Sequence, residues 1–138
     1  RELAIRLLDE GMRRMPPAQV RYTSNNTLPF IEAYYAAGAA DKGDALLREY
    51  ARTLIEYIEY YLRFDGVQGD MVSPIIDEKL DQLGDVYYLA VYAGRKEIIG
   101  EINAYYRSLG VEEENLVDVG DKPHQVDTTL IPRKDTAQ

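Results

Sequence analysis

The chain contains no cysteine and no tryptophan, and it has a single histidine, His124, among its 138 residues. The absence of cysteine excludes disulfides, thiolate nucleophiles and cysteine-based zinc or iron–sulfur sites. No apolar run approaches the roughly 18–20 residues needed to cross a bilayer, so we expect no direct membrane insertion by this segment. Because the chain opens on Arg1 rather than Met, and without a signal segment, we expect it to be part of a longer protein.

Basic residues are also few. Sixteen Lys and Arg face twenty-four Asp and Glu, which gives a formal net charge of −8. Nucleic-acid affinity depends mainly on neutralising phosphates with basic side chains, and anionic membrane surfaces attract the same residues. The composition therefore argues against a nucleic-acid partner and against binding to an anionic membrane.

The sequence has no motif of a catalytic or metal site. Gly-rich phosphate loops, nucleophile elbows and zinc-binding helix motifs are missing. Asp77, Asp81 and Asp85 follow one another at four-residue spacing, which a solvated helix face explains. Glu112 to Glu114 lack the Asp-rich calcium loop pattern, and His124 has no partner in its sequence context. We predict no catalytic residue, no cofactor and no metal in this segment.

Three short motifs match glycosylation acceptors, although an ordinary polar chain explains them as well. Asn25-Asn26-Thr27 fits the N-glycosylation pattern. Asp127-Thr128-Thr129 and Asp135-Thr136-Ala137 resemble the Asp-Thr-apolar O-glycosylation acceptors of some Gram-negative bacteria.

The apolar residues that are present recur at helical spacing. The longest uninterrupted pattern, from Asp44 to Phe64, has apolar residues at three- and four-residue intervals and neither Gly nor Pro. Proline and glycine punctuate the rest, with Gly38, Gly94 and Gly110 as helix stops and Ser73-Pro74 as a helix start. The sequence predicts an all-α array of about five antiparallel helices, at residues 2–15, 27–37, 44–64, 74–93 and 96–109.

The pattern ends at Gly110. Residues 111–138 combine an acidic run, two prolines and scattered apolar residues. We predict one helical-repeat domain over residues 1–110, followed by an irregular tail over 111–138 that packs on the helices or on a neighbouring molecule.

Tyrosine is the abundant aromatic residue, with twelve copies. Four Tyr-Tyr pairs occur, and neighbours on a helix diverge by about 100°, so some rings must leave the core. Tyr is common in recognition surfaces because it combines ring area with a hydroxyl, although it also serves as packing at wet helix interfaces. Our candidates for a binding groove are Tyr35, Tyr61, Tyr88 and Tyr92.

Two segments repeat the same features. Tyr34 to Gly38 and Ala90 to Gly94 each close a helix on a Tyr/Ala-rich turn and Gly, and an amphipathic helix follows each. The pattern resembles tetratricopeptide-like helical hairpins, which repeat about every 34 residues. The match is degenerate, because the expected Trp is missing and the two segments lie 56 residues apart.

The order of features also resembles one family. LLDEGMRRMPP at residues 7–17 precedes Leu28-Pro29 and EAYY at 32–35, and DKGDALL at 41–47 and EYIEYYL at 56–62 follow. This order is similar to the C-terminal region of bacterial membrane proteins related to protein O-mannosyltransferases. The resemblance covers residues 2–109. It implies an extracytoplasmic, periplasmic-side location, tethered to the inner membrane through preceding segments. It assigns no catalytic residue here.

Three functions are consistent with these features. The first is a non-catalytic tetratricopeptide-like interaction or scaffold domain of a membrane-tethered glycosyltransferase-like protein, which binds a protein or its own membrane domain. The second is a substrate-positioning lobe that contacts a glycan or lipid-linked donor. The third is a structural spacer or dimerisation module. The sequence favours no particular oligomeric state.

Overall fold

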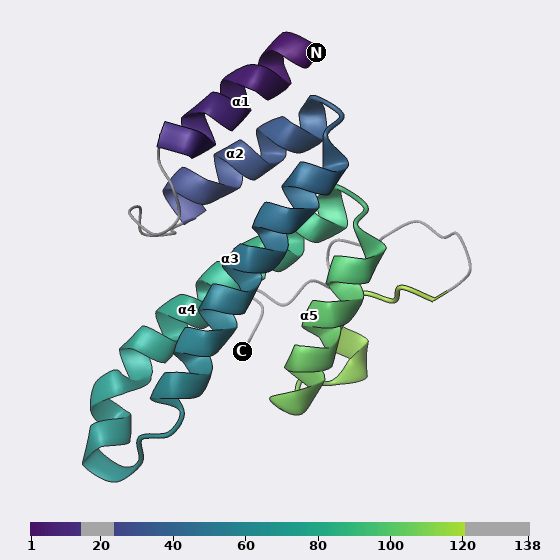
Figure 1. Ribbon diagram of the computed structural model, residues 1–138. Helices are drawn as coiled ribbons and strands as arrows, with labels where there is room; N and C mark the ends of the chain where they lie inside the picture. The colour runs from purple at the N-terminus through teal and green to yellow at the C-terminus, as the bar shows by residue number, and fades with distance from the viewer. Residues whose placement is uncertain (15–23, 121–138) are drawn as a thin grey trace. The chain divides into compact units, whose positions relative to one another are not determined.

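The computed structural model describes residues 1–14 and 24–120, and these form five α-helices and one short 3-10 helix (Figure 1). The helices are α1 (Glu2–Arg14), α2 (Ser24–Ala36), α3 (Ala40–Tyr61), α4 (Gly66–Tyr92), α5 (Lys96–Ser108) and η1 (Glu113–Asn115). No strand occurs among the described residues. The predicted all-α array of five helices is confirmed.

The chain divides into two compact units, Arg1–Tyr50 and the part from Ala51 onward, and α3 contributes to both. In the first unit α1 packs on α2, and Gly11 permits the contact because a Cβ at this position would meet the Phe30 ring at 3.0 Å. Asp9 on α1 accepts hydrogen bonds from the Tyr34 hydroxyl (2.7 Å) and from Lys42 Nζ (2.5 Å). These two bonds lower the pKa of Asp9, the bond from Lys42 most.

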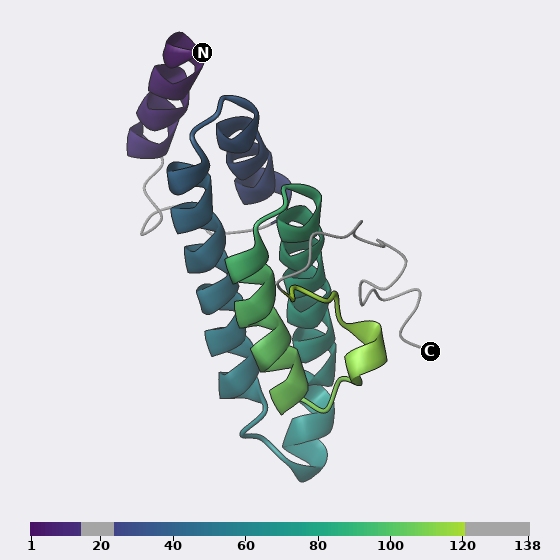
Figure 2. The same cartoon turned by 90° about the vertical axis from the view of Figure 1, so that its right-hand side faces the viewer.

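In the second unit the chain reverses direction between α3 and α4, where Lys79 lies over the Tyr57 ring, and α5 turns back along the C-terminal half of α4 (Figure 2). The buried apolar side chains of α4 all lie between Leu83 and Val91. Those of α5 recur at helical spacing and face inward. The fully buried members of this core are Leu54, Ile58, Leu83, Val86, Tyr87, Ala90, Ile98, Ile99 and Ile102.

Three helices end on the same turn. Gly38, Gly94 and Gly110 all have positive φ, and the residue after each donates its N–H to the carbonyl five residues back. This is the Schellman arrangement, which favours glycine because a Cβ is unfavourable at positive φ. The predicted glycine stops lie where the helices end.

One helix boundary differs strongly from the prediction. α4 begins at Gly66 rather than at residue 74, so the predicted Ser73-Pro74 start is wrong and Pro74 lies inside the helix. Asp65 is the extended N-cap residue, and the helix hydrogen bonding begins with Gly69 N–H to the Asp65 carbonyl. Proline removes one backbone donor, but Pro74 is exposed, and this single loss does not break the helix.

The other boundaries shift by a few residues. α2 begins at Ser24 instead of residue 27, so Pro29 also lies within a helix. α3 runs from Ala40 to Tyr61 rather than from 44 to 64. Such shifts are the usual uncertainty of helix ends, and α5 lies within one residue of its predicted bounds.

Candidate interaction surface

The end of the α3–α4 hairpin exposes a concentration of large apolar side chains. Val67 and Met71, one helical turn apart at the start of α4, are 76% and 73% exposed. The neighbouring end of α3 and the connecting turn add further members. We call this set the tip patch, and it consists of Tyr57, Tyr60, Leu62, Phe64, Val67 and Met71.

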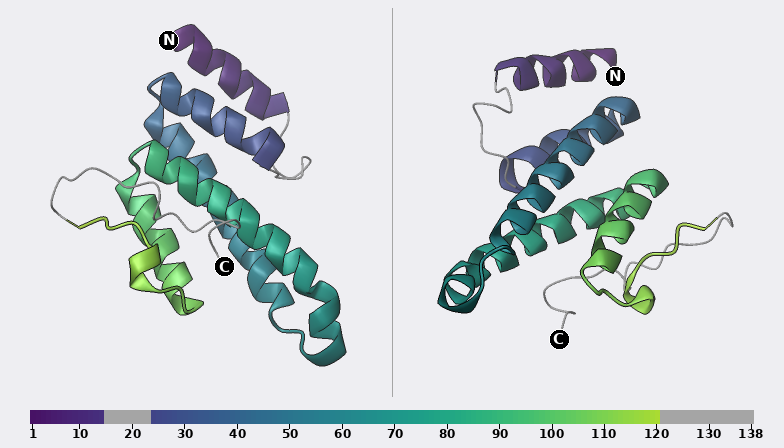
Figure 3. Two further views of the ribbon diagram at one scale, coloured as in Figure 1. Left: turned by 180° about the vertical axis from the view of Figure 1, so that it is seen from behind. Right: turned by 60° about the horizontal axis from the view of Figure 1, so that its bottom comes forward.

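The tip patch is exposed because the helices of the second unit differ in length. α4 has 27 residues and α5 has 13, which correspond to about 40 Å and about 20 Å of helix. α5 therefore runs beside only half of α4, and the hairpin end extends past it (Figure 3). None of the residues from 59 to 82 is buried.

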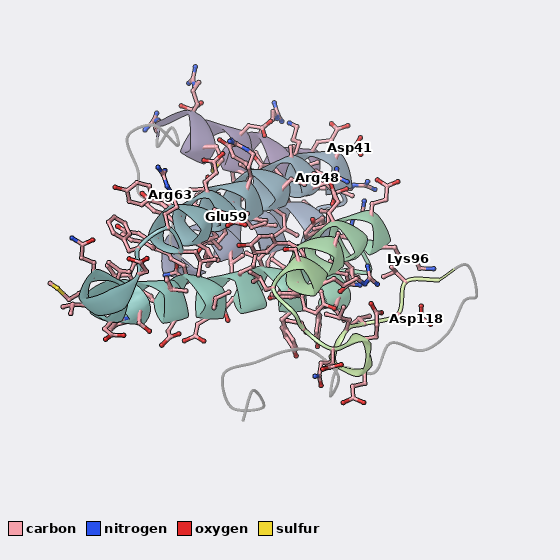
Figure 4. All side chains as sticks on the ribbon, turned by 90° about the horizontal axis from the view of Figure 1, so that it is seen from below. Asp41, Arg48, Glu59, Arg63, Lys96 and Asp118 are labelled. Carbon is pink, nitrogen blue, oxygen red and sulfur yellow. The ribbon has the colours of Figure 1, made fainter. Side chains whose placement is uncertain are left out.

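Aromatic rings are clustered at this end. The Tyr60 ring makes edge contacts with Tyr61 (5.1 Å between centroids) and with Phe64 (5.7 Å). The Arg63 guanidinium lies 5.7 Å from the Tyr60 centroid, and on α4 the Lys79 ammonium lies 5.0 Å from the Tyr57 centroid. Figure 4 shows Glu59 on α3 and Arg63 in the turn that follows it. Both cations of this region are thus placed over tyrosine rings, where the π-electron faces attract them.

The surroundings of the tip patch are acidic. Residues 57–80 contain two basic and five acidic residues, a net of −3. Asp65 and Asp70 lie next to Phe64, Val67 and Met71 in the chain and are exposed. Within the part of the chain that the structure describes, neither carboxylate has an ion-pair partner. The patch therefore joins apolar area with negative charge that is not neutralised locally.

The four predicted groove tyrosines occupy different surroundings. Tyr35, in the first unit, donates its hydroxyl to Asp44 Oδ1 (2.8 Å). Tyr61 is half-buried in the aromatic cluster at the hairpin end. Tyr88 and Tyr92 come together on α4, with centroids 5.7 Å apart, and Tyr92 is 75% exposed. Tyr88 lies about 33 Å along α4 from the hairpin turn, so the structure brings Tyr88 and Tyr92 together but places Tyr61 at the opposite end.

Val67 and Met71 were not among the predicted binding residues, because the predicted helices end at residue 64 and resume at residue 74. The signal that could have found them is their four-residue spacing, which continues to Ile75. Such a row is typical of one helix face, and the two glycines beside it concealed the pattern.

The face between α4 and α5 is covered by the chain's own segment after Gly110. Leu116 and Val117 are buried. The Tyr87 hydroxyl donates to Asn103 Oδ1 (2.6 Å) and accepts the Val117 N–H (2.8 Å), while Asn103 Nδ2 donates to the Val117 carbonyl (2.8 Å). We call these three hydrogen bonds, which join Tyr87, Asn103 and Val117 in a ring, the clasp. Arg107 on α5 also pairs with Glu113, which lowers the pKa of that carboxyl.

The other sequence motifs do not assemble into a site. No group of three or more His, Asp or Glu side chains suited to a metal occurs among the described residues. Asp77 and Asp85 are exposed along α4, and Asp81 between them is half-buried. His124, the Asn25 and Asn26 side chains, and both Asp-Thr motifs lie outside the described residues.

The Tyr105 hydroxyl is shielded from solvent. Among the described residues, no donor or acceptor makes a hydrogen bond of standard geometry with the Tyr105 hydroxyl. Burial, together with the charge of Glu59 on α3, raises the pKa of Tyr105 to about 12. The Tyr105 ring is half-buried.

Among the described helices, none is both long enough and apolar enough to span a bilayer. Comparison of the chain with protein-family models, with curated proteins and with solved structures gave no match. The argument for function therefore depends on the surface itself.

Proposed function

We propose that this chain is a non-catalytic helical interaction module that binds a protein partner through the tip patch. The observation that carries the proposal is the exposure of six large apolar side chains on adjoining turns of one hairpin. Scattered exposed apolar residues are normal on a protein surface, whereas a contiguous apolar patch marks an interaction site. Aromatic residues and Met, which make up most of the patch, are enriched in protein interfaces.

The position of the patch is also consistent with this function. The α4–α5 face, which a helical array would offer to a ligand, holds the chain's own Leu116 and Val117. The hairpin end has no such cover within residues 1–14 and 24–120, since none of the residues from 59 to 82 is buried. A partner that docks at the hairpin end would not have to displace the clasp.

We test this function by site-specific photo-crosslinking in the full chain. A photoreactive residue replaces Met71 in one sample and Tyr92, equally exposed at the far end of α4, in another. Each is mixed with extract of the native cells. We expect a discrete adduct from position 71 and none from position 92, and we expect Val67→Ser to reduce its yield at least tenfold.

Two results contradict the proposal. One is equal crosslinking from positions 71 and 92. The other is an adduct from position 71 that Val67→Ser leaves unchanged, since Val67 shares the face of Met71. Circular dichroism of each variant shows whether the helices are retained.

We further propose that the module has a tetratricopeptide-like arrangement and belongs to a membrane-tethered, glycosyltransferase-like parent, with the module on the periplasmic side. The support is the order of motifs from LLDEGMRRMPP at 7–17 to EYIEYYL at 56–62. Antibodies against the module should detect it in the membrane fraction of native cells. Protease added to the periplasmic space should remove it, and protection from that protease would contradict the location.

A further inference from the structure

We propose that the partner of the tip patch is an amphipathic helix with an apolar face bordered by Lys or Arg. This inference depends on the proposed function, because it names the class of partner for the same surface. It follows from two properties of the hairpin end, namely the secondary structure that it offers and the charge that it carries.

The secondary structure favours a helical partner. An extended peptide gains its affinity by adding backbone hydrogen bonds to an open sheet edge, and the described residues include no strand. The hairpin end instead presents side chains at helical spacing, with Val67 and Met71 on α4, Tyr57 and Tyr60 on α3, and Phe64 in the turn that follows α3. An amphipathic helix docks on such rows through anchors three, four and seven residues apart. Rows of one to two turns need a partner face of only about 10 Å.

The charge favours a basic border on that partner. Asp65 and Asp70 lie beside the patch without ion-pair partners among the described residues. The nearby cations, Arg63 and Lys79, lie over the Tyr60 and Tyr57 rings. Lys or Arg at the edge of a docked helix would neutralise the two carboxylates while its apolar face covers Val67 and Met71. Complementary charges of this kind determine specificity and association rate.

The same charge disfavours two other occupants. A second copy of the chain, also with net charge −8, would bring the Asp65 and Asp70 carboxylates of the two copies together if the patches met face to face. An anionic membrane would meet the same repulsion. An apolar surface with an acidic border therefore fits a basic helix best.

The test uses the full chain and three synthetic peptides of about 18 residues, which form about five helical turns. The first has a Leu/Ile face and a Lys face, the second replaces every Lys with Glu, and the third has the composition of the first with its apolar residues scattered. Calorimetry measures the dissociation constants at low and at physiological salt. We expect the Lys-faced helix to bind at least tenfold more tightly than either of the others, and we expect added salt to weaken its binding.

Variants distinguish this inference from the proposed function. Val67→Ser with Met71→Ser should weaken the Lys-faced helix at least tenfold. Asp65→Asn with Asp70→Asn should abolish most of the difference in affinity between the Lys-faced and the Glu-faced helix. The matched control is Leu3→Ser with Leu7→Ser, two exposed leucines one turn apart on α1, and it should change nothing.

Each remaining outcome overturns one of the two proposals. Equal binding of the Lys and Glu helices, with both lost in the Val67/Met71 variant, refutes the basic partner and retains the tip patch as an interaction surface. If the Val67/Met71 variant binds every peptide as tightly as the parent chain does, the tip patch is not the interaction surface. A dimer in sedimentation, or binding to anionic vesicles, that disappears in the same variant identifies another occupant and also refutes the basic helix.

Discussion

At the scale of single residues, Asn103 is the most constrained polar group of the second unit. It is 1% exposed, and its amide both donates to the Val117 carbonyl and accepts from the Tyr87 hydroxyl. The Tyr87 ring also makes an edge contact with Tyr106, with centroids 5.2 Å apart. A buried polar group is tolerated only when it is fully hydrogen-bonded, and the clasp meets this condition.

Replacing Asn103 by Leu should destabilise the fold by about 2–3 kcal/mol, because the Val117 carbonyl loses its partner inside the protein. The Tyr87 hydroxyl loses its acceptor at the same time. Urea unfolding followed by circular dichroism measures the change. Asn115→Leu on the exposed η1 is the matched control, with an expected effect within about 0.5 kcal/mol. If the two variants proved equally stable, the clasp would contribute no stability.

Tyrosine ionisation should make stability fall above about pH 10. Burial raises the pKa of Tyr106 and of Tyr87 above the ordinary value of 10.0, and burial with the Glu59 charge raises that of Tyr105 to about 12. A raised native pKa gives stability that is complete below pH 10 and decreases as pH rises toward the native pKa, since the unfolded chain loses its protons first.

Urea midpoints at about pH 8 and about pH 11 check this dependence. Tyr106→Phe should reduce the alkaline decrease, whereas Tyr92→Phe, whose ring is exposed, should leave it as in the parent chain. A midpoint that does not change between these pH values would contradict the argument.

The tyrosine pairs show what the sequence could predict about single residues. Neighbours on a helix diverge, and Tyr87 and Tyr106 are buried while Tyr88 and Tyr105 are half-buried. The pattern predicted the divergence, because it depends only on helix geometry. It did not predict which member of each pair faces the core, since that depends on the helices packed against it.

At the scale of elements, the N-terminal half of α4 is a helix without a buried side chain, and it contains Pro74. Most helical stability in proteins comes from burying one face. This half should therefore open locally more often than residues 83–91, which carry the buried apolar side chains.

Pro74→Ala should slow amide hydrogen exchange around residues 70–78 by about tenfold or more, because Ala restores an N–H to the Asp70 carbonyl and favours the helix. The global unfolding midpoint should change much less, since the segment opens before the core unfolds. Hydrogen exchange followed by mass spectrometry measures the exchange rates of amides in both halves of α4. Ser73→Ala, which removes no backbone constraint, is the control, and equal slowing in both variants would contradict the role of Pro74.

The start of α4 also shows why element boundaries could not all be predicted. Ser73-Pro74 has the composition of a helix start, and Gly66 and Gly69 have that of a loop. Local preference favours a helix from residue 74, yet the chain is helical from Gly66, and Lys79 on this part of α4 lies over the Tyr57 ring of α3. The glycine stops were predicted correctly because a positive φ is a local requirement, whereas pairing between helices is not.

At the scale of the whole molecule, negative charge opposes self-association. With a net charge of −8, copies repel one another at neutral pH, and this repulsion disappears near the isoelectric point of about 4.7. Apolar surface that is exposed on the tip patch can then drive association.

Light scattering should therefore rise steeply near pH 4.7 and stay low near pH 7. Val67→Ser with Met71→Ser should reduce the acid-induced scattering at least several-fold. The Leu3→Ser with Leu7→Ser control tests whether any exposed leucine pair has this effect. Equal scattering of the parent and the Val67/Met71 variant would exclude the tip patch as the associating surface.

The fold class could be predicted because apolar residues recur at helical spacing in the five predicted helices. The tip patch could not be, since its exposure arises from the unequal lengths of α4 and α5. Packing of the segment after Gly110 on the helices or on a neighbour was predicted, but its contacts were not, because Tyr87 and Asn103 lie 30 and 14 residues away from Val117 in the chain.

The clasp has a consequence for how the segment after α5 can change. It holds Val117 by its peptide N–H and carbonyl, and the Val117 side chain is buried, so the number of residues before position 117 is constrained as well as its side chain. The chain is fixed at one end by the turn at Gly110 and at the other by the clasp. Deleting one residue between them would place Asp118 at the clasp and put its charged side chain where the buried Val117 lies. Length, as well as composition, is a property that this connection must conserve.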